Sequence, residues 1–174
     1  MKKIIITLII LVISLIGINK VNSKDIIIPK EAIRLRVIAN SNNSEDQKVK
    51  YEVTNHMQEK IYELLKNTKN IDEARKIINN NIDYLSSEVE KKLEAEAYPF
   101  SYELKYGLNF FPEKIYKGVK YEEGYYESLL ITLGEGEGNN WWCVLFPPLC
   151  IMEAEESDEV EYKFFIQEII EKYL

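Results

Sequence analysis

The spacing of apolar residues changes at Tyr98-Pro99, and this change constrains the fold more than any other feature of the chain. Before it, apolar residues recur every three or four positions, as they do along amphipathic helices. After it, they alternate with polar residues, as they do in strands that bury one face. With a short strand ahead of the helices, this order predicts an α+β fold. We expect a small, mainly antiparallel sheet packed against two or three amphipathic helices.

The helical half is expected to follow a strand and a turn. Residues Ile33–Ala39 alternate like a half-buried strand, and the polar run Asn40–Asn43 predicts a turn. Ser44 is expected to cap a helix that reaches about Lys66, with Gln47 completing a capping box.

A second helical stretch covers residues 71–97. The asparagines at 79–81 have poor helix propensity, so either one helix continues through them or a new helix begins there. Beyond Pro99, strands are expected at 102–110, 125–133 and 141–146, with a short edge strand within 115–121 that Gly118 interrupts.

The first residues resemble a secretory signal. Lys2 and Lys3 precede an apolar run at 4–18, and a cleavage-like ending falls near Ser23. A short uncleaved anchor is the alternative, and either reading implies export. The expected organisation is a signal or anchor at 1–23, a linker at 24–32, an α+β domain at 33–152, and an acidic loop with a closing helix at 153–174.

The charge of the chain argues against two classes of partner. The net charge is −7, and three of the lysines lie in the first 23 residues, so the rest is still more acidic. Nucleic-acid binding and adhesion to an anionic membrane both rely on clustered basic residues. We expect no nucleic-acid partner, and membrane contact only through the N-terminal segment.

Few residues suggest chemistry. The only histidine, His56, lies at the margin of an apolar stripe and is expected to be packed or at the surface. The alternative pairs it as a base with Cys143 as a thiol nucleophile. Two cysteines and one histidine do not form a zinc pattern, and the glutamates near 135 and 153–156 lack the spacing of a calcium loop. We expect no metal and no cofactor.

The glycine-rich run Gly134–Gly138 is expected to be structural. Glutamates stand between its glycines and would repel a phosphate, so a phosphate-binding loop is disfavoured. Glycines there permit a tight turn with positive φ between two strands.

The segment that follows, Trp141–Phe146, has two apolar faces. Alternation places Trp141, Cys143 and Leu145 on one side, and Trp142, Val144 and Phe146 on the other. The second face is either covered by the closing helix or left as an apolar surface for a partner.

Pro147 and Pro148 cannot continue a central strand, so we expect a rigid, extended, apolar segment there. The flanking cysteines could form a disulfide, Cys143–Cys150, worth roughly 2.5 kcal/mol, or could both be reduced and buried.

Three blocks of the chain together resemble one known family. Asn140–Cys150 after a Gly-Glu-Gly-x-Gly run, the opening Ile33–Ser41, and Phe111-Pro112-x-Lys114-x-Tyr116 are similar to the stage II sporulation protein R family. The resemblance runs from about Ile33 to Cys150.

The resemblance implies a non-enzymatic signalling protein of endospore formation. It would be made in the forespore and exported into the space between forespore and mother cell. There it would activate a membrane-embedded aspartic protease of the mother cell that processes pro-sigma-E. The resemblance brings no catalytic residues.

Combined with the apolar segment, it suggests a set of protease-contacting residues: Trp141, Trp142, Phe146, Pro147, Pro148, and on the opening strand Arg34 and Arg36. For the two arginines, a solvated strand face is the alternative. For the whole chain, the alternatives are an exported thiol enzyme that uses Cys143 and a structural component of the septum.

Overall fold

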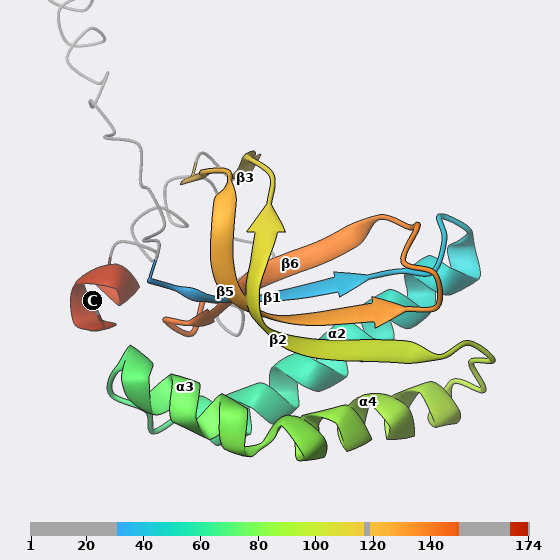
Figure 1. Ribbon diagram of the computed structural model, residues 1–174, viewed down its shortest axis with the longest axis horizontal. Coiled ribbons are helices and arrows are strands. Elements are labelled where there is room, and N and C mark those ends of the chain that lie inside the picture. The colour runs from blue at the N-terminus through green and yellow to red at the C-terminus, as the bar shows by residue number, and fades with distance from the viewer. Residues whose placement is uncertain (1–30, 117–118, 150–167, 174) are drawn as a thin grey trace, which may run out of the picture.

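The computed structural model describes residues 31–116, 119–149 and 168–173, and Figure 1 shows how their helices and strands are arranged. In chain order these are β1 (Ile33–Ile38), α2 (Ser44–Leu65), α3 (Ile71–Asn80), α4 (Ile82–Ala95), β2 (Tyr102–Phe111), β3 (Lys114–Tyr116), β4 (Val119–Tyr121), β5 (Gly124–Leu133) and β6 (Asn140–Phe146). Residues 168–173 are also helical.

The predicted α+β class is confirmed, with a four-stranded sheet in the order β2-β5-β1-β6. The β2–β5 and β1–β6 pairs are antiparallel, and β1 runs parallel to β5. The first strand of the domain therefore lies between two strands from its last third. Leu35, for example, is opposite Leu129 on one side and Cys143 on the other.

Helices α2, α3 and α4 cover one face of this sheet (Figure 1). The core lies between the two layers, because the alternating apolar residues of β1 and β5 meet the apolar stripes of the helices. Fully buried examples are Leu35 and Val37 from β1, Ile131 from β5, and Val53 and Val89 from the helices.

The start of α2 differs from the expected capping box. The N-cap is Asn43, whose side-chain oxygen accepts a hydrogen bond from the backbone N–H of Asp46. The side chain of Gln47 turns away to the carbonyl of Ser41. Asparagine is as good a cap as serine, so the sequence allowed both registers and the cap falls one residue earlier than predicted.

The second helical stretch restarts at its asparagines. Helix α3 ends at Asn80 and α4 begins at Ile82. Between them, the side-chain amide of Asn81 donates to the carbonyl of Ile77, which satisfies a backbone group that the broken helix leaves free.

The expected edge strand within 115–121 is instead a separate two-stranded sheet. β3 pairs antiparallel with β4, and neither belongs to the main sheet. The residues at 117–118 lie outside the described part.

The glycine loop between β5 and β6 has the predicted positive φ angles, 54° at Gly134 and 67° at Gly136. It does not form a hairpin, because β1 lies between the two strands that it connects. Instead it is tied to the turn after β1. The side-chain oxygen of Asn40 accepts from the N–H of Glu135, and that of Asn42 accepts from the N–H of Asn139.

Several predictions fall on residues outside the described part: the signal or anchor at 1–23, most of the linker at 24–32, Cys150, and the acidic loop. Of the closing helix, residues 168–173 are described, and Ile169 packs with Val144 and Leu149. Among the helices of the described residues, none has the length and apolar character needed to cross a bilayer.

A candidate recognition site at the outer edge of the sheet

Strand β6 forms an edge of the sheet, and among the described strands it pairs with β1 alone. Its first residues alternate as predicted. Trp141, Cys143 and Leu145 pack on or in the main core, whereas Val144 belongs to a second, smaller cluster. Trp142 lies with that second face, against Phe111 and Tyr121.

Phe146 does not follow the predicted alternation. It was expected beside Trp142, yet it is 1% exposed within the main core. The β1–β6 register shifts between Ile33 and Arg34, so that Ile33 is opposite Phe146 while Arg34 is opposite Val144. Such a bulge inserts one residue and reverses the side to which the following side chain points.

The predicted extended segment after β6 is instead a turn at Pro147-Pro148, in which the N–H of Leu149 donates to the carbonyl of Pro147. Pro147 and Leu149 are buried, and Pro148 is partly exposed. The turn thus closes one end of the site and offers little surface of its own.

Arg34 is the residue that the structure places most unexpectedly. A solvated strand face was one alternative for it, but the residue is 1% exposed. Its guanidinium carbon lies 3.4 Å from the ring centroid of Tyr126, 5.2 Å from that of Phe111 and 6.0 Å from that of Tyr121. Aromatic rings from β2, β4 and β5 therefore surround the cation.

None of the three guanidinium nitrogens of Arg34 makes a hydrogen bond to the protein. Burial lowers the pKa of Arg34, although an arginine in a protein remains protonated. A buried charge without a partner is costly, and a desolvated cation–π contact returns about 2 kcal/mol. The aromatic cage therefore compensates part of the cost and leaves the N–H donors unused.

Arg36, two residues along the strand, is in a different environment. It is partly exposed, and its Nη1 donates a 3.0 Å hydrogen bond to the backbone carbonyl of Phe110. Burial lowers its pKa too. Its guanidinium thus has an acceptor, which that of Arg34 lacks.

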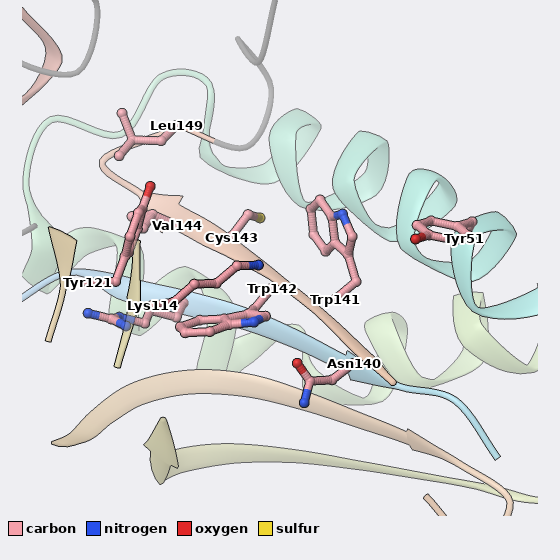
Figure 2. Close-up of a pocket in the computed structure, with 10 residues that line it drawn as sticks. Tyr51, Lys114, Tyr121, Asn140, Trp141, Trp142, Cys143, Val144 and Leu149 are labelled. Atoms are coloured by element: carbon pink, nitrogen blue, oxygen red, sulfur yellow. The ribbon is translucent and has the colours of Figure 1, made fainter. Parts of the chain in front are cut away.

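A cavity of about 230 Å³ lies along β6 (Figure 2). Arg34 is one of the residues that line it. The ammonium of Lys114 lies 5.2 Å from the ring centroid of Trp142, and Figure 2 shows the two side chains one above the other. The described residues that line it are Arg34, Tyr51, Lys114, Tyr121, Asn140, Trp141, Trp142, Cys143, Val144 and Leu149. Five consecutive residues of the edge strand, from both of its faces, therefore border one cavity.

The cavity combines apolar walls with cations. Among the described residues that line it, two are basic and none is acidic. This arrangement is suited to binding a group that is apolar along its length and anionic at its end.

The structure separates the two members of the thiol-enzyme alternative. His56 on α2 contacts Glu88 on α4, with 3.1 Å between Nε2 and Oε2, and does not line the cavity that Cys143 lines. Cys143 is not a free thiol among the described residues. Its predicted partner Cys150 lies outside them, so the pairing stays a prediction. In the described ranges, no three histidine, cysteine or acidic side chains are grouped as metal ligands would be.

Of the predicted contact residues, Arg34, Trp141 and Trp142 line the cavity, whereas Phe146, Pro147, Pro148 and Arg36 do not. Sequence reasoning missed Lys114, Tyr121, Phe111 and Tyr126. Strand alternation could have indicated two of them, because Phe111 on β2 and Tyr126 on β5 lie on the same face of the sheet as Arg34 on β1. The pairing that brings them together was not apparent from the sequence.

Comparisons with known proteins agree on one family. A family model described as stage II sporulation protein R matches residues 29–156, a range that includes all the described residues that line the cavity. Stage II sporulation protein R of Bacillus subtilis (strain 168) is 36% identical over 143 residues. The match covers 82% of this chain, which spans 64% of that relative's length. No solved structure matches significantly. The chain belongs to the stage II sporulation protein R family.

Proposed function

We propose that this protein is an exported signal of endospore formation that activates a membrane-embedded aspartic protease of the mother cell. It is made in the forespore and is exported across the forespore membrane, with its N-terminal segment as the export signal. In the space between the two cells it causes the protease to remove the pro-sequence of sigma-E. The protein contributes binding and no bond-breaking chemistry of its own.

Family membership is the observation that carries this proposal, because it assigns the chain to sporulation. The site is consistent with a binding role. It has a cavity with aromatic and cationic walls. Its strand β6 is held by pairing with β1 on one side, and the loop before it is held by the hydrogen bonds from Glu135 to Asn40 and from Asn139 to Asn42. Rigid surfaces lose little entropy on binding and so suit recognition.

The apolar run at 4–18 with its preceding lysines supports export. The acidic charge of the chain supports a partner that is a protein and not a nucleic acid.

Reconstitution tests the proposal. The full-length protein, the cognate protease and the pro-sigma factor are produced together in a non-sporulating host, and removal of the pro-sequence is followed by gel mobility. Cleavage that requires this chain is the expected result. Cleavage that proceeds equally without it, or fails although the chain is folded and exported, would refute the proposal.

A Cys143→Ala variant in the same system addresses the thiol-enzyme alternative. If Cys143 were a catalytic nucleophile, replacing its thiol by a methyl group would abolish pro-sequence removal. We expect pro-sequence removal to survive the substitution, provided that folding is retained. If the protein is instead a structural component of the septum, the pro-sequence should be removed to the same extent with and without the chain.

A further inference from the structure

We propose that the cavity along β6 is a carboxylate-binding pocket in which Arg34 is the anion-recognising residue. Its occupant is an aspartate or glutamate side chain on an extended segment of the partner protein. That the partner is the protease rests on the proposed function, whereas the preference for a carboxylate rests on the pocket alone.

The unused donors of Arg34 carry this inference. All three guanidinium nitrogens are buried and without a hydrogen-bond partner, which is rare in folded proteins. The aromatic rings of Tyr126 and Phe111 lie on the guanidinium. They hold it in place, but a ring face accepts no pair of parallel N–H bonds. A carboxylate does, because its two oxygens match the planar fork of arginine.

The size of the cavity selects the kind of ligand. Pockets for drug-sized molecules are roughly 300–1,000 Å³, whereas this one is about 230 Å³. It suits a single side chain. The tilted contact of Trp142 with Phe111, and that with Tyr121, provide apolar walls for the methylene groups of such a side chain.

The position of the cavity selects the way in which the ligand is presented. It borders residues Asn140–Val144 of an edge strand, and among the described strands β6 has a neighbour on one side only. An extended peptide can lie along such an edge and direct alternate side chains into pockets beside it. The carboxylate would reach Arg34 from one of these positions.

Titration of the full-length protein tests the pocket without the protease. The probe is a glutamate residue capped at both backbone ends, and binding is followed through the NMR signal of the Trp142 indole N–H. Its matched control is the capped glutamine, which has the same shape without the charge. Charge-assisted hydrogen bonds predict binding of the glutamate at least about tenfold tighter than that of the glutamine. Equal affinities, or no saturable shift with either probe, would overturn the inference.

Two further arms identify the recognising residue and the anion. Arg34→Met should reduce glutamate binding to the glutamine level. Lys105→Met, which removes an exposed lysine paired with Glu103 on β2, should leave it unchanged. Inorganic phosphate should bind more weakly than the capped glutamate. Phosphate binding of equal or greater strength would replace a carboxylate pocket by a general anion site.

The titration and the reconstitution fail independently. A failed titration overturns carboxylate binding at the pocket, but the protein could still activate the protease through another surface. Absence of chain-dependent pro-sequence removal defeats the proposed function whatever the titration gives. If the capped glutamate binds at Arg34 while Arg34→Met activates the protease normally, the pocket does not receive the protease, and its assignment as a partner site is wrong.

Discussion

The guanidinium of Arg34 lies against the ring of Tyr126, with 3.4 Å between the guanidinium carbon and the ring centroid, and it makes no hydrogen bond. An arginine in this setting stabilises the fold poorly. Its position at the wall of a cavity is better explained by a ligand than by folding, because structural arginines in protein interiors are usually paired.

Replacing Arg34 by methionine should therefore leave the free energy of unfolding unchanged or raise it by about 1–4 kcal/mol. Apolar replacement of a buried charge often has this effect. Urea unfolding at neutral pH measures it. A decrease of more than about 1 kcal/mol would mean that Arg34 is structural, and would remove the argument for a ligand.

The contact between the two residues should be visible as a coupling. Tyr126→Leu removes the aromatic face and part of the packing, and should destabilise by about 3–5 kcal/mol. In the Arg34→Met background the loss should be smaller by about 2 kcal/mol, because no cation remains to be stranded.

Tyr126→Phe is the matched control for this cycle. It keeps the ring and loses only the hydroxyl, which donates to the carbonyl of Glu122 at 2.8 Å. That loss should amount to about 1 kcal/mol and should be the same in both backgrounds. A coupling measured with Tyr126→Phe as large as that with Tyr126→Leu would assign the interaction to the hydroxyl and not to the ring.

Gly138 should tolerate no side chain. A Cβ there would lie 2.3 Å from the carbonyl oxygen of Ser41, a backbone atom that cannot rotate away. Gly138→Ala should destabilise by roughly 1–3 kcal/mol, as overpacking does, and should displace the start of β6. Glu137→Ala changes an exposed neighbour in the same loop and should have little effect on the urea midpoint. Similar midpoints for the two variants would contradict the close packing of this loop against the turn after β1.

Asp46 should make stability depend on pH. Burial alone would raise the pKa of its carboxyl. Hydrogen bonds, among them those from Asn40, Tyr98 and Asn43, outweigh burial and lower the pKa below its usual value. The stabilisation is therefore fully present above pH about 4, where an unfolded aspartate is ionised, and is lost as the pH falls through the lower folded-state pKa.

The Asp46→Asn variant tests this dependence. It should be less stable by about 1–3 kcal/mol at pH 7, and its stability should fall less between pH 5 and 3 than that of the natural protein. A residual slope is expected, because hydrogen bonds from Lys91 and His56 lower the pKa of Glu88 as well, despite its burial. Parallel pH profiles would show that Asp46 does not contribute.

Local features of the fold were predictable because they depend on neighbours in the sequence. The strands of the sheet and the stripe of α2 follow from periodicity, and the positive φ angles of Gly134 and Gly136 follow from residue type. The insertion of β1 between β5 and β6 was not predictable, because it depends on pairing between residues far apart in the chain.

The site was predictable only in part for the same reason. Trp141 and Trp142 were predicted as contact residues from the apolar segment and the family resemblance, and both line the cavity. The burial of Arg34 requires Phe111, Tyr121 and Tyr126 to fold over one face of the sheet from three different strands. The position of Phe146 depends on a bulge in the pairing with β1, which leaves no pattern in the strand itself.

The most direct measurement is the rate of pro-sequence removal in the reconstituted system, compared among the natural chain, Arg34→Met and Lys105→Met, with exported protein levels matched. We expect Arg34→Met to lower the rate at least about tenfold, as loss of a charge-assisted contact does, while the protein remains as stable as before. With Lys105→Met, the pro-sequence should be removed at the same rate as with the natural chain. Equal rates for all three chains would contradict the account, since activation would then not pass through the pocket along β6.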